Sequence, residues 1–287
     1  MIELKLMTDS TSDLSPEELS RMDIGVIPLT VTFGMDTYVD GQEIDVPRLF
    51  ELVQATGRLP KTSAPPTEAF RQAFQPYVDA GVPVLFIGLS SALSSTVAHA
   101  ALAARELPEG TVYVVDSVTG AGLLGGLLRI AWRWQQEGRS LEEILRGLER
   151  IKSRYRLLFA VENLEFLHKG GRLNLAQLLF GSALQIKPII RMDPKGMTVW
   201  RKTRGPNAAL RLMLEQAKKD RGHILFQEVH IATTPGDTEV CQSLTRQLQQ
   251  ATGAKLCHQY GLGCILSSHC GPGLWGFGYY LDETAEL

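Results

Sequence analysis

Three times in its first half, the chain runs from an apolar segment through a loop rich in Ser, Thr and Asp into a segment of helical composition. The apolar segments cover residues 2–7, 82–88 and 111–115, and the helical segments begin near residues 16, 96 and 123. Strands that alternate with helices in this way are typical of a parallel sheet covered by helices on both faces. We therefore predict an α/β fold with an N-terminal, doubly wound parallel sheet.

Local start signals support individual elements of this part. Ser15 followed by Pro16 is a typical N-cap and first position of a helix. Asp45 is a second N-cap residue, and it predicts a helix over residues 46–55. Residues 26–33 are rich in β-branched side chains and predict a further strand between these two helices.

The sequence rhythm changes after Arg150. Six short β-rich segments follow and are separated by three helical segments, which predicts a C-terminal α+β domain built on a largely antiparallel sheet. The predicted strands cover residues 157–161, 186–191, 197–204, 228–233, 255–259 and 276–280, and the predicted helices cover 164–168, 207–219 and 239–251. We place the boundary near Ser153, giving an α/β domain over 1–152 and an α+β domain over 153–287.

Hydroxyl-rich loops follow the three predicted parallel strands. Asp9 and Ser10 come after the first strand, Ser94 lies in the loop after the second, and Ser117 follows the third. Ligands of open α/β sheets bind beyond the carboxyl ends of the strands, where such loops meet. A hydroxyl in any one loop is more often a helix cap. Three loops of this kind nevertheless favour a shared polar site.

Three motifs outside these loops carry further candidate side chains. Prolines after Thr62 and Ser63 stiffen an extended segment, although composition alone favours an ordinary connector. Two glycines place Arg172 on a tight turn after the predicted helix 164–168. There its planar fork suits a carboxylate or phosphate, and a solvated side chain is an equal alternative. His269 lies in a predicted glycine-rich turn, where a histidine is usually a satisfied hydrogen-bonding group.

Composition and missing motifs exclude several classes of protein. A formal net charge of −2 provides no basic field for nucleic acid. The four cysteines form no C-x-x-C pair and the histidines no ligand spacing, so no metal site is predicted. The longest apolar run, residues 118–128, is far shorter than the roughly 20 residues that span a bilayer. With no signal-peptide pattern and no ATP-binding or nucleophile-elbow motif, we expect a cytoplasmic protein with free thiols.

Seven segments, taken in order, resemble the DegV family. Each is weak alone, but together they run from the first predicted strand almost to the C-terminus and make a specific match. The segments are TDSTSD at 8–13, KTS at 61–63, SALSST at 91–96, VDS at 115–117, LEFL with KGGR between 164 and 172, GSALQIKP at 181–188, and HCGPG at 269–273.

The resemblance implies a two-domain protein that binds one long-chain fatty acid, such as palmitate. Members of the family include the acyl-carrying, FakB-like subunits of bacterial fatty acid kinase. In that system a separate kinase subunit uses ATP to phosphorylate the fatty-acid carboxylate, and the acyl phosphate enters phospholipid synthesis. The resemblance thus implies a lipid-binding protein without catalytic residues or a cofactor, with a fatty acid kinase subunit as its partner. We expect a monomer that is not an integral membrane protein.

Roles for individual residues follow from the same resemblance. Thr62 and Ser94 match the hydroxyls that hold the carboxylate. Arg172 and His269 match residues at the mouth of the headgroup site, which serve phosphoryl transfer or kinase docking. Supporting positions around the same site are Asp9, Ser10, Ser63 and Ser117.

The chain departs from the family pattern at three positions. Ser95 stands where the family usually has glycine, Cys270 where it has threonine, and Ala64 where it has glutamine. None of these changes removes a residue assigned to the carboxylate. Apolar side chains of the second domain are candidate walls around the acyl chain, although each alone is more often ordinary core; they are Leu173, Leu175, Leu178, Leu179, Phe180, Leu184 and Ile186.

Two other functions stay open as alternatives. Ser94 with His269 would suit a serine-dependent acyl hydrolase or transferase, and such an enzyme would turn over acyl esters. A lipid-responsive regulatory protein would bind the same kind of ligand without a kinase partner.

Overall fold

The N-terminal part of the chain forms a four-stranded parallel sheet, here called the first sheet. It is seen in a computed structural model that describes residues 3–162, 164–173, 186–234 and 238–286. The strand order is β2-β1-β6-β7, and all neighbouring pairs are parallel, which confirms the predicted α/β architecture. The strands are β1 (Lys5–Asp9), β2 (Ile24–Ile27), β6 (Val84–Gly88) and β7 (Val112–Asp116).

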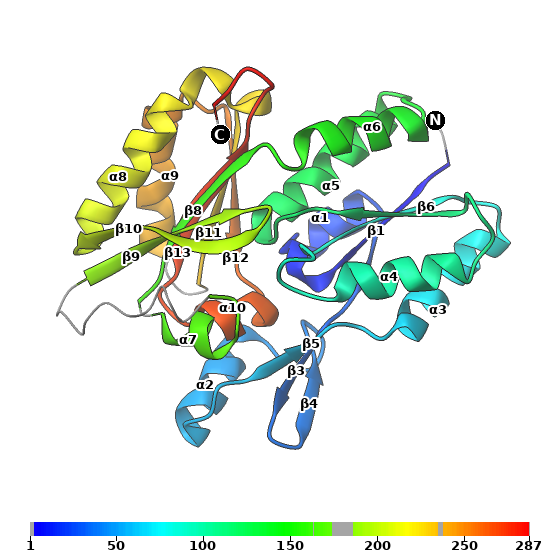
Figure 1. The fold of residues 1–287 in the computed structure, drawn as a ribbon, viewed down its shortest axis with the longest axis horizontal. Helices are drawn as coiled ribbons and strands as arrows, with labels where there is room; N and C mark the ends of the chain where they lie inside the picture. Colours follow the sequence, from blue (N-terminus) through cyan, green and yellow to red (C-terminus); the bar gives the residue numbers. More distant parts are fainter. Residues whose placement is uncertain (1–2, 163, 174–185, 235–237, 287) are drawn as a thin grey trace.

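Helices cover both faces of the first sheet (Figure 1). On one face, Leu6 and Ile87 of the sheet pack with Leu124 in a core to which three helices contribute side chains. On the other face, Phe70 and Phe86 anchor a core of aromatic rings in edge contact. The first face carries α1 (Pro16–Arg21), α5 (Ala121–Gln136) and α6 (Leu141–Ile151), and the second carries α3 (Thr67–Asp79) and α4 (Thr96–Arg105).

The predicted N-caps are confirmed. The Ser15 hydroxyl accepts the Glu18 N–H, and the Glu18 carboxylate accepts the Ser15 N–H, so that α1 begins with a reciprocal capping box. Asp45 accepts the Arg48 N–H at 2.9 Å and starts α2 (Val46–Thr56). These bonds satisfy N–H groups that have no partner inside their own helix.

A three-stranded antiparallel sheet, the small sheet, lies below the first sheet in Figure 1. Its order is β4-β3-β5, with β3 (Thr30–Phe33), β4 (Asp36–Val39) and β5 (Lys61–Ser63). The prediction of a single strand over residues 26–33 is wrong. The chain leaves the first sheet after Ile27, because Pro28 has no N–H for the ladder, and it joins the small sheet at Thr30.

The C-terminal part forms a six-stranded mixed sheet, the second sheet, in the order β10-β9-β8-β13-β11-β12. Within the described residues its neighbours are antiparallel except for β11 and β12, which confirms the largely antiparallel prediction. The strands are β8 (Tyr155–Ala160), β9 (Ile186–Asp193), β10 (Gly196–Arg204), β11 (Glu228–Thr233), β12 (Leu256–Gly261) and β13 (Trp275–Tyr280).

The second sheet is covered on both faces. On one face, Met213 of α8 (Pro206–Lys219) and Leu248 of α9 (Thr238–Thr252) pack against Phe277. On the other, Phe159 and Leu274 join a core that includes α7 (Glu165–Lys169) and α10 (Cys264–Cys270). This second core lies where the second sheet approaches the rest of the molecule (Figure 1).

Helix α10 corrects a prediction. His269 was predicted in a glycine-rich turn, but it lies in the last turn of α10, whose seven residues are all buried. Gly271, with φ of +75°, ends this helix. The glycines at 271 and 273 therefore signal the exit from a helix, and the apolar residues before them were too few to reveal it.

The two halves contact each other along α5. Arg129 of α5 is buried, pairs with Glu18 at 2.5 Å and also donates to the Tyr260 hydroxyl on β12. The predicted domain boundary falls between the end of α6 and the start of β8. None of the helices that the structure describes combines the length and the apolar composition needed to cross a bilayer.

Candidate functional site

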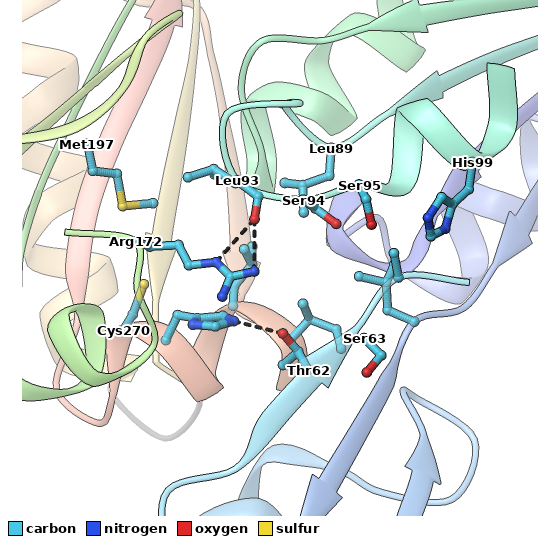
Figure 2. A pocket seen from close by; sticks show the side chains of 15 residues that line it. Thr62, Ser63, Leu89, Leu93, Ser94, Ser95, His99, Arg172, Met197 and Cys270 are labelled. Atoms are coloured by element: carbon cyan, nitrogen blue, oxygen red, sulfur yellow. Dashed lines mark hydrogen bonds between the residues drawn. The ribbon is translucent and has the colours of Figure 1, made fainter. Parts of the chain in front are cut away.

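A cavity of about 310 Å³ lies where the first sheet, the small sheet and α10 meet. Its size is at the lower end of the roughly 300–1,000 Å³ of ligand pockets. Polar residues from four distant segments line it: Thr62, Ser63, Ser94, Ser95, His99, Arg172 and His269. Figure 2 shows this polar cavity from close by. Each of the four residues predicted for the carboxylate and the headgroup mouth is among the lining residues.

Thr62 and His269 are in direct contact. Thr62 lies on β5, and its Oγ1 is 2.8 Å from Nε2 of His269 on α10, as the dashed line in Figure 2 shows. The imidazole is 9% exposed, and burial, with a smaller contribution from the Arg172 charge, lowers the pKa of His269 to about 4. The ring is therefore neutral at neutral pH.

The second ring nitrogen of His269 determines the tautomer. Nδ1 is buried against Gly170, where an added Cβ would lie 2.3 Å away, and it has no hydrogen-bond partner among the described residues. A proton on Nδ1 would be a buried donor without an acceptor, so we assign the proton to Nε2. The Nε2–H group then donates to Thr62 Oγ1, and the Thr62 hydroxyl keeps its own proton for a ligand.

Ser94 approaches the polar cavity from the loop between β6 and α4. Its Oγ lies 2.8 Å from the Thr96 hydroxyl and accepts the Thr96 N–H at 3.3 Å. Ser90 shapes the loop before it, because the Ser90 carbonyl accepts the N–H groups of Leu93 and Ser94. The Ser94 hydroxyl faces the interior of the polar cavity in Figure 2.

Arg172 reaches the polar cavity from the opposite side. Gly171, with φ of +73°, makes the turn that directs the chain there after α7. The Nε and Nη2 atoms of Arg172 donate to the Leu93 carbonyl at 3.1 and 2.9 Å, and its Nη1 atom donates to the Gly170 carbonyl at 2.6 Å. These bonds use three of five N–H groups. Burial lowers the pKa of Arg172, and no carboxylate of the described residues forms an ion pair with it.

The predicted supporting residues divide into two groups. Ser63 lines the polar cavity, whereas Asp9, Ser10 and Ser117 lie behind it. Asp9 is fully buried and accepts the Leu89 N–H at 2.7 Å, and burial raises its pKa. Ser10 Oγ accepts the Leu29 N–H at 3.2 Å. Since Leu89 and Leu29 both line the polar cavity, these two residues contact its wall from behind.

Ser117 acts on the loop that carries Ser90. Its hydroxyl donates to the Thr119 carbonyl at 3.0 Å, and the same carbonyl accepts the Ser90 N–H at 2.9 Å. Ser117 is fully buried and lies two hydrogen bonds away from the loop of Ser94. Its contribution to a ligand site in this structure is therefore indirect.

A second cavity of about 50 Å³ adjoins the polar one and is lined by apolar side chains. Leu93, Met197, Leu266 and Cys270 line both, so the two cavities share a wall. The remaining walls of this apolar cavity come mainly from the second sheet and the loop before α5; they include Leu157, Phe159, Met192, Leu274, Gly120 and Ala121.

The apolar walls differ from those expected. Leu173 and Ile186 are not among the described residues that line either cavity, and Leu173 instead packs in the core beside α7 and α10. Leu175, Leu178, Leu179, Phe180 and Leu184 lie outside the described residues. Met197 and His99, which line the polar cavity, were missed; His99 has no motif of its own, and Met197 reads as an ordinary strand residue.

The three departures from the family pattern lie at or beside this site. Ser95 and Ala64 line the polar cavity, and Ser95 is exposed. Cys270 lies between the two cavities, and burial raises the pKa of its thiol to about 12. Cys270 is therefore an uncharged, weakly polar group at neutral pH.

The geometry does not assemble a nucleophile with Ser94 and His269. Ser94 Oγ is bonded to Thr96, while His269 Nε2 is bonded to Thr62. A general base also needs a pKa near the working pH and an orienting partner. His269 has a pKa of about 4, and its Nδ1 has no such partner in the described part of the chain. No group of three potential metal ligands occurs among the described residues either.

Comparison with known proteins gives consistent matches over nearly the whole chain. The family model described as "Uncharacterised protein, DegV family" matches residues 3–282. A fatty acid-binding protein of Thermotoga maritima is 28% identical, over 98% of this chain and 99% of its own. A DegV family protein from Thermus thermophilus, solved for its fatty acid binding, superimposes with a TM-score of 0.90 at 31% identity, over 98% of this chain and 100% of the other. DegV of Bacillus subtilis, described as a fatty acid binding protein, gives 0.86 at 27% identity with the same coverage.

Proposed function

Because the chain belongs to the DegV family, we propose that it binds a long-chain fatty acid between the first and second sheets. The carboxylate occupies the polar cavity, and the hydrocarbon tail enters the apolar one, whose side chains move apart because its volume of about 50 Å³ holds only a short part of a long alkyl chain. The similar proteins of Thermus thermophilus and Bacillus subtilis, both described as binding fatty acids, support this proposal.

The observation that carries the proposal is the shared wall of the two cavities. Four residues, Leu93, Met197, Leu266 and Cys270, line both the polar and the apolar space. A ligand that fills both must be polar at one end and apolar at the other. Burial of each methylene contributes about 0.8 kcal/mol, which makes a long alkyl chain the most favourable occupant of the apolar side.

The carboxylate headgroup requires hydrogen-bond donors, and hydroxyl groups of the polar cavity supply them. The Thr62 hydroxyl keeps a free proton, because His269 donates to its oxygen, and Ser94 faces the same space. These two O–H groups hydrogen-bond the carboxylate, and the positive charge of Arg172 lies on the same cavity wall. The anion is thus held without a fully buried ion pair, whose desolvation cost is large.

We extend the proposal to presentation of the carboxylate to a separate ATP-dependent kinase. Ser63 and Ser95 are exposed lining residues, so a partner can reach the headgroup from solvent. Two N–H groups of Arg172 stay unused by the Leu93 and Gly170 carbonyls and can stabilise charge that develops during phosphoryl transfer. We propose that the protein acts in the cytoplasm as a monomer, and its four free cysteines suit a reducing compartment.

Mass spectrometry of the lipid extracted from purified protein tests the ligand. We expect one fatty acid per chain, with an alkyl tail of about 16 carbons. The delipidated protein should then bind added palmitate and show no turnover of palmitoyl esters. Absence of any lipid, together with no binding of palmitate or other fatty acids by the delipidated protein, would reject the proposal. Ester turnover that depends on Ser94 would support the hydrolase instead.

A further inference from the structure

Helix α10 has no side-chain cap of its own. Its N-cap is Gly263, which has no side chain to accept the first N–H groups of the helix. Two carboxylates from the first 40 residues accept them instead. The Gly263 N–H donates to Asp13 Oδ1 at 3.0 Å, and the Cys264 N–H donates to Asp40 Oδ1 at 3.2 Å. The start of α10 is therefore held by another part of the chain.

Both carboxylates are attached to the sheets that carry the ligand hydroxyls. Asp13 ends the short turn after β1, with a φ of 51°. Asp40 directly follows β4 of the small sheet, is 5% exposed, and receives a hydrogen bond from the Ser10 side chain. Because β5 belongs to the same small sheet, Asp40 and Thr62 are parts of one framework.

Helix α10 connects this framework to His269. Its seven side chains are all buried and close-packed, so a change at the start of the helix is transmitted to its end. His269 lies five steps along the helix from Cys264, a rise of about 7.5 Å at 1.5 Å per residue. At the far end, His269 is confined between Thr62, at 2.8 Å from Nε2, and Gly170 beside Nδ1.

We propose that Asp13 and Asp40 are positioning residues for the headgroup site: by holding the start of α10, they set the position at which His269 meets Thr62. Neither carboxylate lines the polar cavity. Both line a separate cavity of about 470 Å³ on the other side of the α10 N-terminus, together with Ser10 and Gly263. Their effect on a ligand is therefore transmitted through α10. The positioning of His269 does not depend on the proposed function; only the expected effect on ligand affinity rests on it.

The first readout is the protonation of His269, followed by NMR of its ring protons in delipidated protein. A displaced α10 exposes the imidazole, so its pKa should rise from about 4 toward the ordinary value of 6.5. We expect Asp13→Ala and Asp40→Ala each to raise the charged fraction at pH 6 from about 1% to at least 10%. Asp13→Asn and Asp40→Asn keep one oxygen acceptor and should stay close to wild type.

Two further variants separate positioning from general destabilisation. Gly263→Ala is a mild change, because alanine readily adopts the φ of −70° at this position. The added methyl group would nevertheless lie 3.2 Å from Asp13 Oδ1 and press on that contact. It should raise the pKa of His269 by a smaller amount than the alanine variants do. It also provides the test if Asp13→Ala or Asp40→Ala fails to fold. Ser140→Ala removes the cap of α6, far from the site, and should lower thermal stability without moving the titration.

A double-mutant cycle supplies the second readout. Asp13→Ala should weaken palmitate binding at least tenfold in wild type and by less than twofold in a His269→Ala background, because the effect passes through His269. Equal losses in both backgrounds, or a folded Asp13→Ala and Asp40→Ala pair with an unchanged His269 titration, would overturn the proposal. If no form of the protein binds palmitate, the proposed function fails, and the NMR titration alone still decides the positioning role.

Discussion

Thr62 Oγ1 and His269 Nε2 lie 2.8 Å apart although 207 positions separate the two residues in sequence. The contact joins the small sheet to α10 and leaves the Thr62 proton available to an anion. It gives the polar cavity a neutral donor pair in place of a second fixed charge. The following predictions start from this pair and its neighbours.

Thr62→Val should weaken fatty-acid binding about 10- to 100-fold. Valine has nearly the same shape but removes the donor, and a hydrogen bond to a charged group contributes about 1.5–3 kcal/mol. Calorimetric titration of delipidated protein with palmitate measures the loss. Thr32→Val is the matched control, since Thr32 lies in the same small sheet and pairs with Thr37 at the surface. Equal affinities for the two variants would contradict the role of Thr62.

Arg172→Ala should leave palmitate affinity within about threefold of wild type but slow acyl-phosphate formation by roughly 100-fold or more in the presence of a kinase and ATP. The reason is that the two Arg172 N–H groups not bonded to the Leu93 and Gly170 carbonyls face the negative charge that grows in the transition state. Binding and phosphorylation are measured separately on the same preparation. Arg172→Lys keeps the charge without the fork and should fall between the two. Full-rate phosphorylation of Arg172→Ala would refute the role.

Fatty acids of increasing length should bind with steadily rising affinity until the apolar cavity is full. Each added pair of methylenes contributes about 1.6 kcal/mol, or about 15-fold in Kd. Competition of saturated acids of 8, 10, 12, 14 and 16 carbons against a fluorescent analogue measures the slope. A flat series would show that the tail lies in solvent.

Gly170→Ala should disturb the headgroup site through contact alone. The φ of Gly170 is −73°, which alanine adopts readily, but the new methyl group would lie 2.3 Å from His269 Nδ1 and 2.8 Å from the Phe166 carbonyl. We expect a stability loss of about 1–3 kcal/mol and at least tenfold weaker palmitate binding. Gly222→Ala is the control, because no atom of the described residues lies within 4 Å of its added Cβ. Equal stability and equal palmitate affinity of the two variants would contradict the role of the close contact between Gly170 and His269.

Stability of the delipidated protein should fall with acidification through His269. The pKa of this residue is about 4 in the fold and about 6.5 when unfolded, so the unfolded state binds the proton more readily between these values. The penalty is absent above pH 6.5, grows as the pH falls, and is complete below pH 4. Between pH 7.5 and 4.5, wild type should lose on the order of 2–3 kcal/mol more than His269→Gln in urea unfolding. Equal losses would show that His269 titrates normally.

Helix caps and strand alternation predicted much of the fold, because these signals are local. Ser15 and Asp45 each cap a helix through bonds that span three residues. The split between β2 and β3 was not visible in the same way. Residues 26–33 carry β-branched side chains on both sides of Pro28, and which sheet each half joins is decided by distant partners: Ile27 pairs with Asp9 of β1, whereas Thr30 pairs with Ser63 of β5.

The candidate site shows the same limit. Motifs identified Thr62, Ser94, Arg172 and His269, all of which line the polar cavity. They did not identify Met197 or Phe159, because an apolar strand residue carries no mark of which face it turns to a ligand. Nor did they reveal that Asp13, inside a recognised motif, binds the N-terminus of α10.

The dispersal of the polar cavity over β5, the loop before α4, the turn after α7 and α10 has a consequence for biosynthesis. A nascent chain can close the first sheet once β7 has left the ribosome, yet the headgroup pocket still lacks two of its four sides. Contacts between such remote segments form slowly, because the intervening chain must be ordered first. We therefore expect a chain that is truncated before α10 to retain no lipid, because α10 supplies the last side of the proposed headgroup pocket.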